Sequence, residues 1–161
     1  MKLWRALSRG VMVAQADNSK GDRISLEELR FISLFQDITG AMVYRAIEDA
    51  ESNRLFYLVD KNDLGKAIGK DGRNVKTLSK ILNKNVEVIG YAPDLESMVR
   101  NLFPGISVLK VDVVDKGDGK VIYVKVKDDE KGKAIGKDGR NVKRARVVLL
   151  KLFNVDKVVI R

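Results

Sequence analysis

One segment of twelve residues occurs twice in the chain, letter for letter, and this repeat constrains the fold more than any other feature. Residues 65–76 read GKAIGKDGRNVK, and the same letters return at residues 132–143. Chance does not produce such an identity in a chain of 161 residues. The repeat therefore predicts two units of the same architecture, each about the size of a small domain.

The residues that flank the two copies agree in pattern rather than in letters. Apolar runs at residues 54–59 and 120–127 precede the copies and are typical of strands. After each copy the apolar residues recur with the period of a helix, and a run rich in β-branched residues follows. Each copy is therefore expected to lie between a strand and a helix that leads into another strand.

Upstream of these strands, each unit carries a helix and a polar turn. Ser25 followed by Glu28 is a capping-box pattern at the start of one helix, and Asp94 is a candidate N-cap for the other. Polar turns near residues 51–53 and 116–119 are expected to join pairs of strands. Each unit therefore reads as helix, strand, strand, helix, helix, strand.

This order predicts an α+β fold with two consecutive α-β-β-α-α-β units, each a three-stranded sheet with helices packed on one face. The first unit is expected at residues 24–91 and the second at residues 92–161. Residues 1–23 precede the pattern and are expected to form a mobile N-terminal extension. An amphipathic helix that contacts a partner or a membrane surface is the alternative there, from the apolar residues Leu3, Trp4, Leu7 and Val11.

The chain contains neither cysteine nor histidine. Disulfides, thiolate or imidazole metal sites and histidine-dependent catalysis are therefore excluded. The best cluster of carboxylates, residues 128–130, precedes an expected helix, where acids favour the helix dipole. Neither a membrane-spanning run nor a secretory segment is evident. We expect a cytoplasmic protein that is not an enzyme. It is expected to bind no metal, cofactor, membrane or small-molecule substrate.

A Gly-x-x-Gly turn, residues 69–72 and 136–139, lies at the centre of each repeat between two expected helices. Glycine allows a ligand to approach the backbone closely, and the free N–H groups at the start of the next helix favour a phosphate. The acidic residue inside each turn is expected to cap that helix. The residues expected to bind a nucleic-acid backbone are Ile68, Gly69, Lys70, Asp71, Gly72, Arg73 and Lys76 in the first unit, and Ile135, Gly136, Lys137, Asp138, Gly139, Arg140 and Lys143 in the second.

Positive charge is concentrated around these turns. Lys and Arg number 31 against 22 acids, a net charge of +9, which suggests a polyanionic partner. Residues 65–84 contain six Lys or Arg and one acid, and residues 131–151 contain eight and one. A solvated helix face would explain why charged residues occur in these segments, but not why nearly all of them are positive. Residues 92–161 contain 16 Lys or Arg against 10 acids, whereas residues 25–91 contain ten of each sign. The second unit is therefore expected to bind its polyanionic partner with the steeper salt dependence.

The segments 68–75 and 135–142 resemble the KH family, whose Gly-x-x-Gly loop clamps about four nucleotides of single strand. The chain has room for only one strand after the second copy, which is the order of type II KH domains. Two such units joined directly, with an Asn-Leu-Phe-Pro element at residues 101–104, most resemble archaeal NusA-like transcription elongation and termination factors.

The resemblance implies binding of single-stranded nascent RNA, association with RNA polymerase, and a role in termination or antitermination. A KH adaptor for ribosome assembly or RNA processing is the alternative. The join at residues 90–93 is short and contains Pro93, which restricts itself and the residue before it. We therefore expect the two units to bind one continuous RNA strand.

Overall fold

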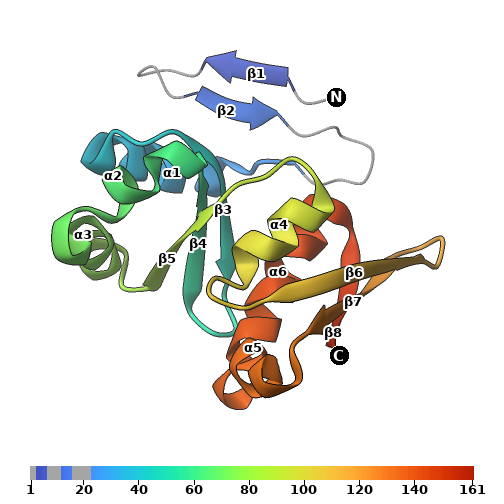
Figure 1. Cartoon of the computed structure of the whole chain (residues 1–161). Helices are drawn as coiled ribbons and strands as arrows, with labels where there is room; N and C mark the ends of the chain where they lie inside the picture. The colour runs from blue at the N-terminus through green and yellow to red at the C-terminus, as the bar shows by residue number, and fades with distance from the viewer. Residues whose placement is uncertain (1–2, 7–11, 16–22) are drawn as a thin grey trace. The chain divides into compact units, whose positions relative to one another are not determined.

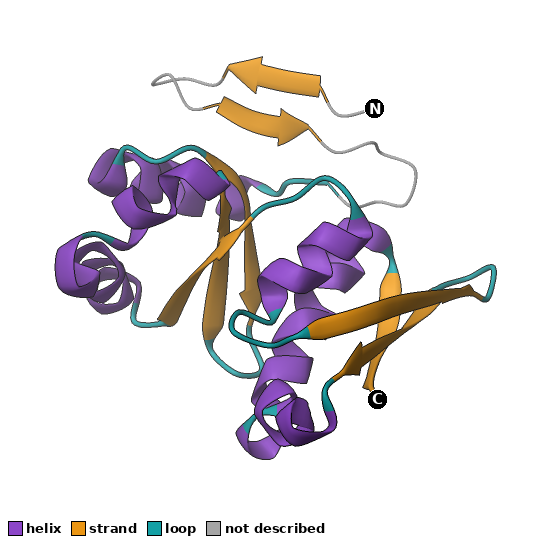
Figure 2. Cartoon of the chain, viewed as in Figure 1, coloured by secondary structure: helices purple, strands orange, loops and turns teal. Residues whose placement is uncertain are grey.

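The computed structural model describes residues 3–6, 12–15 and 23–161 (Figure 1). The chain divides into two compact units, Met1–Tyr91 and Ala92–Arg161. Among the residues that the structure describes, 23–91 and 92–161 each form one three-stranded sheet together with three α-helices, and Figure 2 distinguishes helices from strands by colour. The predicted order α-β-β-α-α-β and the α+β class are confirmed in both units.

In the first unit the sheet has the order β3-β4-β5. Strands β3 and β4 are antiparallel, whereas β4 and β5 are parallel and are connected through a short helix and a longer one. The elements are α1 (Leu26–Thr39), β3 (Val43–Asp49), β4 (Arg54–Val59), α2 (Leu64–Ile68), α3 (Arg73–Leu82) and β5 (Asn85–Gly90).

Helix α1 begins where the sequence predicts, but only half of the expected capping box forms. The Ser25 Oγ accepts a hydrogen bond of 3.1 Å from the Glu28 N–H. The Glu28 carboxylate does not return to Ser25: its Oε2 accepts from Arg45 Nε at 2.7 Å and from the Ala46 N–H at 3.0 Å. Glu28 therefore joins α1 to the edge strand β3, because a buried carboxylate needs a charged partner and hydrogen bonds.

The core of the first unit lies between its helices and one face of the sheet. The rings of Phe35 from α1 and Tyr57 from β4 lie 4.1 Å apart between centroids, and both are fully buried. The Tyr57 hydroxyl donates to the Phe31 carbonyl at 2.8 Å, and burial raises the pKa of Tyr57. Val75 and Val88 are partly buried and pack against this core.

The second unit repeats this topology, with a sheet of order β6-β7-β8. Asp94 accepts from the Ser97 N–H at 2.9 Å, which confirms the predicted N-cap. The last helix is longer than its counterpart, with 14 residues in α6 against 10 in α3. The elements are α4 (Leu95–Leu102), β6 (Val108–Asp115), β7 (Lys120–Val126), α5 (Lys131–Ile135), α6 (Arg140–Phe153) and β8 (Val155–Ile160).

One acid fastens the start of the first strand to the helix before the glycine loop in both units. In the first, Asp63 Oδ2 accepts from the Met42 N–H at 2.8 Å. In the second, Glu130 accepts from the Ser107 N–H at 2.6 Å and from its hydroxyl at 3.1 Å. The bond from the Ser107 N–H is the main cause of the lowered pKa of Glu130.

Before the first unit, strands β1 (Leu3–Ala6) and β2 (Met12–Gln15) pair in antiparallel fashion. The possible amphipathic helix is therefore wrong at Leu3 and Trp4, while Leu7 and Val11 lie outside the described residues. The mobility of segment 1–23 stays a prediction. No helix within the described residues is long and apolar enough to cross a membrane.

Candidate nucleic-acid interface

The two glycine turns have nearly the same backbone. Gly69 has φ 78° and ψ 168°, and Gly136 has φ 80° and ψ 170°. This conformation is essentially restricted to glycine. The following 3-10 turns, Lys70–Gly72 and Lys137–Gly139, lead directly into α3 and α6. The identical residues therefore fold into the same local structure in both units.

An asparagine after each turn fixes this geometry. Asn74 Nδ2 donates to the Lys66 carbonyl at 3.0 Å, and Asn141 Nδ2 donates to the Lys133 carbonyl at 3.1 Å. Each bond connects the first turn of the long helix to the short helix before the loop. Neither asparagine was predicted to contribute to the site, although the twelve-residue repeat contains both and is the signal that could have identified them.

The acidic residues inside the turns do not cap the helices, so this prediction is wrong. Gly72 and Gly139 are the N-cap residues, and no side chain caps either helix. Asp71 and Asp138 instead have a left-handed backbone with φ 57°, a conformation that Asp tolerates better than most residues. Both side chains are exposed.

Cations surround the start of each helix. Lys70, Arg73 and Lys76 are exposed around the first turn, as are Lys137, Arg140 and Lys143 around the second. The Cε atoms of Lys76 and Lys143 each lie 3.9 Å from where a Cβ on the second glycine of the turn would be. The lysine stems therefore lie beside the turns. Backbone N–H groups and several cations together form an environment that favours phosphate.

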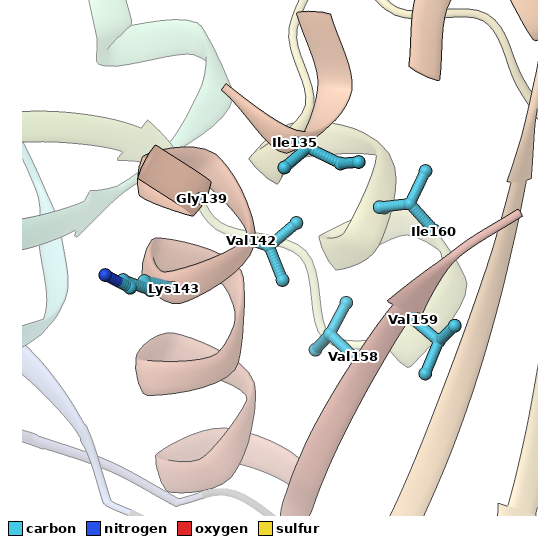
Figure 3. Close-up of a pocket in the computed structure, with 7 residues that line it drawn as sticks. All are labelled: Ile135, Gly139, Val142, Lys143, Val158, Val159 and Ile160. Carbon is cyan, nitrogen blue, oxygen red and sulfur yellow. The ribbon is translucent and has the colours of Figure 1, made fainter. Parts of the chain in front are cut away.

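Beside the second turn lies an open cavity of about 370 Å³ between α5, α6 and β8. In Figure 3 the side chains of Ile135, Val142, Val158 and Ile160 point toward this opening, and Val159 points away from it. Lys143 also contributes to the lining, although in Figure 3 its side chain points to the other side of α6. Ile135 is 40% exposed, so part of its side chain is accessible to a ligand in the opening. We refer to this cavity as the second groove.

The strand side of the second groove was not predicted from the sequence. Val158 and Ile160 come from β8, which was identified only as a strand; its alternation would have placed both on one face. In the first unit Ile68 is 39% exposed, close to the value for Ile135. The structure thus gathers a cationic turn, a helix start and an aliphatic surface with no aromatic lining residue in the second groove.

Two family models match the chain. The model described as the NusA-like second KH domain matches residues 95–155. A model described as the KH domain matches residues 31–114. The first match contains α5, the second glycine turn and α6, and it ends at Val155, the first residue of the groove strand β8.

Named relatives and a solved structure resemble most of the chain. "Probable transcription termination protein NusA" of Methanococcus vannielii is 33% identical over 136 residues, which are 84% of this chain and 78% of that protein. The protein with the same description in Halobacterium salinarum is 32% identical and is covered to 96% of its length. The crystal structure of APE1850 is 54% identical, has a TM-score of 0.83, and covers 86% of this chain and 100% of that chain.

Proposed function

The chain belongs to the NusA-like family of KH proteins, and we propose that it binds single-stranded RNA through both glycine turns and acts as a transcription termination factor on nascent RNA. The observation that carries this proposal is the cationic glycine turn, built twice with the same backbone angles and with the same asparagine brace. The two copies share both their surface charge and their loop shape, which is expected of a ligand site, whereas packing alone does not require the same surface charge.

The proposed binding mode divides the RNA between two parts of each site. Phosphates lie against the N–H groups at the start of α3 or α6, where Lys70 or Lys137 and the neighbouring cations offset their charge. Bases lie on the aliphatic surface that Ile135, Val142 and Ile160 form in the second groove. Paired bases in a duplex do not expose their faces to such a surface, so the site favours single strands.

The transcriptional part of the proposal rests on the relatives. Their shared description as transcription termination proteins supports a role at the end of transcription, and association with RNA polymerase follows as the simplest route to nascent RNA. A KH adaptor in ribosome assembly or RNA processing is not favoured by these relatives. The proposed activity is binding and includes no catalytic step.

Charge reversal in the turns tests RNA binding. The double variant Lys70→Glu with Lys137→Glu is expected to lose at least about tenfold in affinity for single-stranded RNA and to flatten the salt dependence. The matched control is Arg30→Glu with Lys125→Glu, two exposed cations on α1 and β7 that change the net charge equally. Fluorescence anisotropy with a labelled RNA measures affinity, and circular dichroism checks folding. Equal losses in both double variants would mean that net charge, not the turns, binds RNA.

A second experiment separates transcription from the ribosomal alternative. A tagged full-length chain is isolated from growing cells after brief crosslinking, and the associated proteins and RNAs are identified. Recovery of RNA polymerase subunits with RNA 3′ regions supports the proposed function. Recovery of ribosomal proteins with pre-ribosomal RNA, and no polymerase, would replace it with the adaptor function.

A further inference from the structure

Strand β6 lies at the edge of the second unit's sheet and carries exposed apolar side chains. In the part of the chain that the structure describes, β6 pairs only with β7. Leu109 is 54% exposed, and Val113 and Val114 are each 47% exposed. Edge strands with exposed apolar residues are templates for pairing with another strand.

The corresponding edge strand of the first unit differs. In β3 the apolar residues Val43, Ala46 and Ile47 are all buried. Both edge strands contain an irregularity near their start, between Val43 and Arg45 and between Val108 and Lys110. The irregularity therefore belongs to the fold, whereas the exposed apolar residues are particular to β6. From Lys110 to Asp115 the pairing of β6 with β7 is regular.

The residues of β6 are complementary to themselves when the strand is reversed. Around Val111 the sequence reads Leu-Lys-Val-Asp-Val, residues 109–113. Antiparallel pairing with a two-fold axis at Val111 places Lys110 opposite Asp112 of the second copy, and Asp112 opposite its Lys110. The same register places Leu109 opposite Val113 and brings the two Val111 residues together. Opposite charges and apolar pairs directly across two strands are both favourable.

We propose that β6 pairs with β6 of a second copy of this chain, in antiparallel fashion about Val111, to form a two-fold dimer with a continuous six-stranded sheet. A two-fold interface uses the same patch on both copies, which is what a self-complementary strand provides. Lys110 Nζ lies 3.5 Å from Asp112 Oδ1 within the chain, but this surface ion pair contributes little stability. Both groups can therefore turn to partners across the axis.

The dimer leaves the second groove open. The groove is formed at β8, and the order β6-β7-β8 places β8 at the opposite edge of the sheet from β6. The six-stranded sheet therefore has one groove at each outer edge. Because a single pair of strands is a small interface, we expect a weak dimer with a Kd on the order of 10 to 100 µM.

Charge exchange between two variants of the full chain tests the pairing register. In the Lys110→Asp variant, positions 110 and 112 of the two copies bring four acids together at the axis. In the Asp112→Lys variant, the same positions bring four lysines together. Each variant alone is therefore expected to dimerise about tenfold or more weakly than the wild type. A mixture of the two restores both opposite-charge pairs. Sedimentation velocity is expected to show the wild type and the mixture moving from 18.0 kDa toward twice that mass with rising concentration, with each variant alone remaining nearer one chain.

A cysteine at the axis gives an independent readout, because the chain contains no cysteine of its own. Directly opposite Cα atoms in an antiparallel pair lie about 4.5 to 5.5 Å apart, within the range of a disulfide. Val111→Cys is expected to form a disulfide-linked dimer on mild oxidation. Lys125→Cys on β7 is the control, because three strand spacings of about 4.8 Å separate the two β7 strands.

Three results would overturn the proposal. The wild type could remain monomeric up to several times the expected Kd. The mixture of the charge variants could associate no better than either variant alone. The cysteine at position 125 could crosslink as readily as the cysteine at position 111.

RNA affinity of each charge variant, measured at concentrations where all chains are monomeric, is expected to equal that of the wild type.

Discussion

Asn74 occupies the space that a side chain on Gly69 would need. A Cβ on Gly69 would lie 2.9 Å from Asn74 Nδ2, and the φ of Gly69 is +78°. In the second unit a Cβ on Gly136 would lie 2.8 Å from Asn141 Nδ2. The glycine and the asparagine are thus required together, because the asparagine that braces the loop leaves no room for any other residue at the first turn position.

Replacement of this glycine is expected to damage the loop. Gly69→Ala combines a disfavoured backbone conformation with the displacement of Asn74, and we expect a cost of about 1–3 kcal/mol and weaker RNA binding. Gly65→Ala is the matched control, because a Cβ there meets nothing within 4 Å. Urea unfolding and RNA titration of the two variants provide the comparison. Equal stability of the two variants would contradict the expected strain.

The brace itself can be removed without changing the glycine. Asn141→Ala loses the bond to the Lys133 carbonyl, and we expect about 1 kcal/mol of destabilisation and faster amide hydrogen exchange in α5. The effect on RNA affinity is expected to exceed the effect on stability, since the turn positions the helix start. Unchanged exchange in α5 would show that the asparagine does not hold the loop.

Salt dependence is expected to differ between the two units. The segment 131–151 carries eight Lys or Arg and one acid, against six and one in segment 65–84. With the first turn disabled by Lys70→Glu, the remaining binding through the second unit is expected to fall more steeply with salt than binding with Lys137→Glu. Affinities measured from low to moderate salt provide both slopes. The opposite order would mean that local charge does not decide the strength of the sites.

RNA length is expected to reveal whether both units bind one strand. Two sites of about four nucleotides each predict that affinity rises until an RNA of about eight to twelve nucleotides. The rise follows from the second contact being intramolecular. In the Lys137→Glu chain the rise is expected to stop at about half that length. A wild-type affinity that also levels off at the shorter length would leave one unit outside RNA binding.

Acid is expected to weaken the attachment of Ser107 to Glu130. The bond from the Ser107 N–H lowers the pKa of Glu130 from its ordinary value of 4.5. A lowered folded-state pKa contributes stability above the unfolded-state pKa, and this contribution is lost as the pH falls through the folded-state value. Glu130→Gln is therefore expected to be less stable than the wild type at neutral pH, with a difference that shrinks below about pH 4.5. Unfolding measured across this range tests the sign; a constant difference would contradict it.

Local patterns in the sequence predicted the helices and strands well, because the spacing of apolar residues and the residue preferences of turns depend on only a few neighbouring residues. The strand pairs around residues 51–53 and 116–119 and the cap at Asp94 are examples. Contacts between distant residues were not predictable in this way. Glu28 lies three residues from Ser25, yet its carboxylate binds Arg45, 17 positions away.

The sequence predicted the residue types of the candidate site better than their arrangement in space. The repeat indicated the turns and their cations, but the predicted caps at Asp71 and Asp138 were wrong because a glycine with a left-handed backbone occupies each N-cap. The groove strand β8 was missed as part of the site, since only the packing of β8 beside α5 and α6 brings Val158 and Ile160 to the cavity.

The near identity of the two turns limits where selectivity for RNA sequence can reside. The two turns share twelve residues and nearly the same backbone angles, so exchanging one turn for the other would not change the base preference of either unit. Any difference in the bases that the two units prefer must originate outside them. Strand β5 reads Asn-Val-Glu-Val-Ile-Gly and β8 reads Val-Asp-Lys-Val-Val-Ile, and these dissimilar strands are where the two units can diverge in what they recognise.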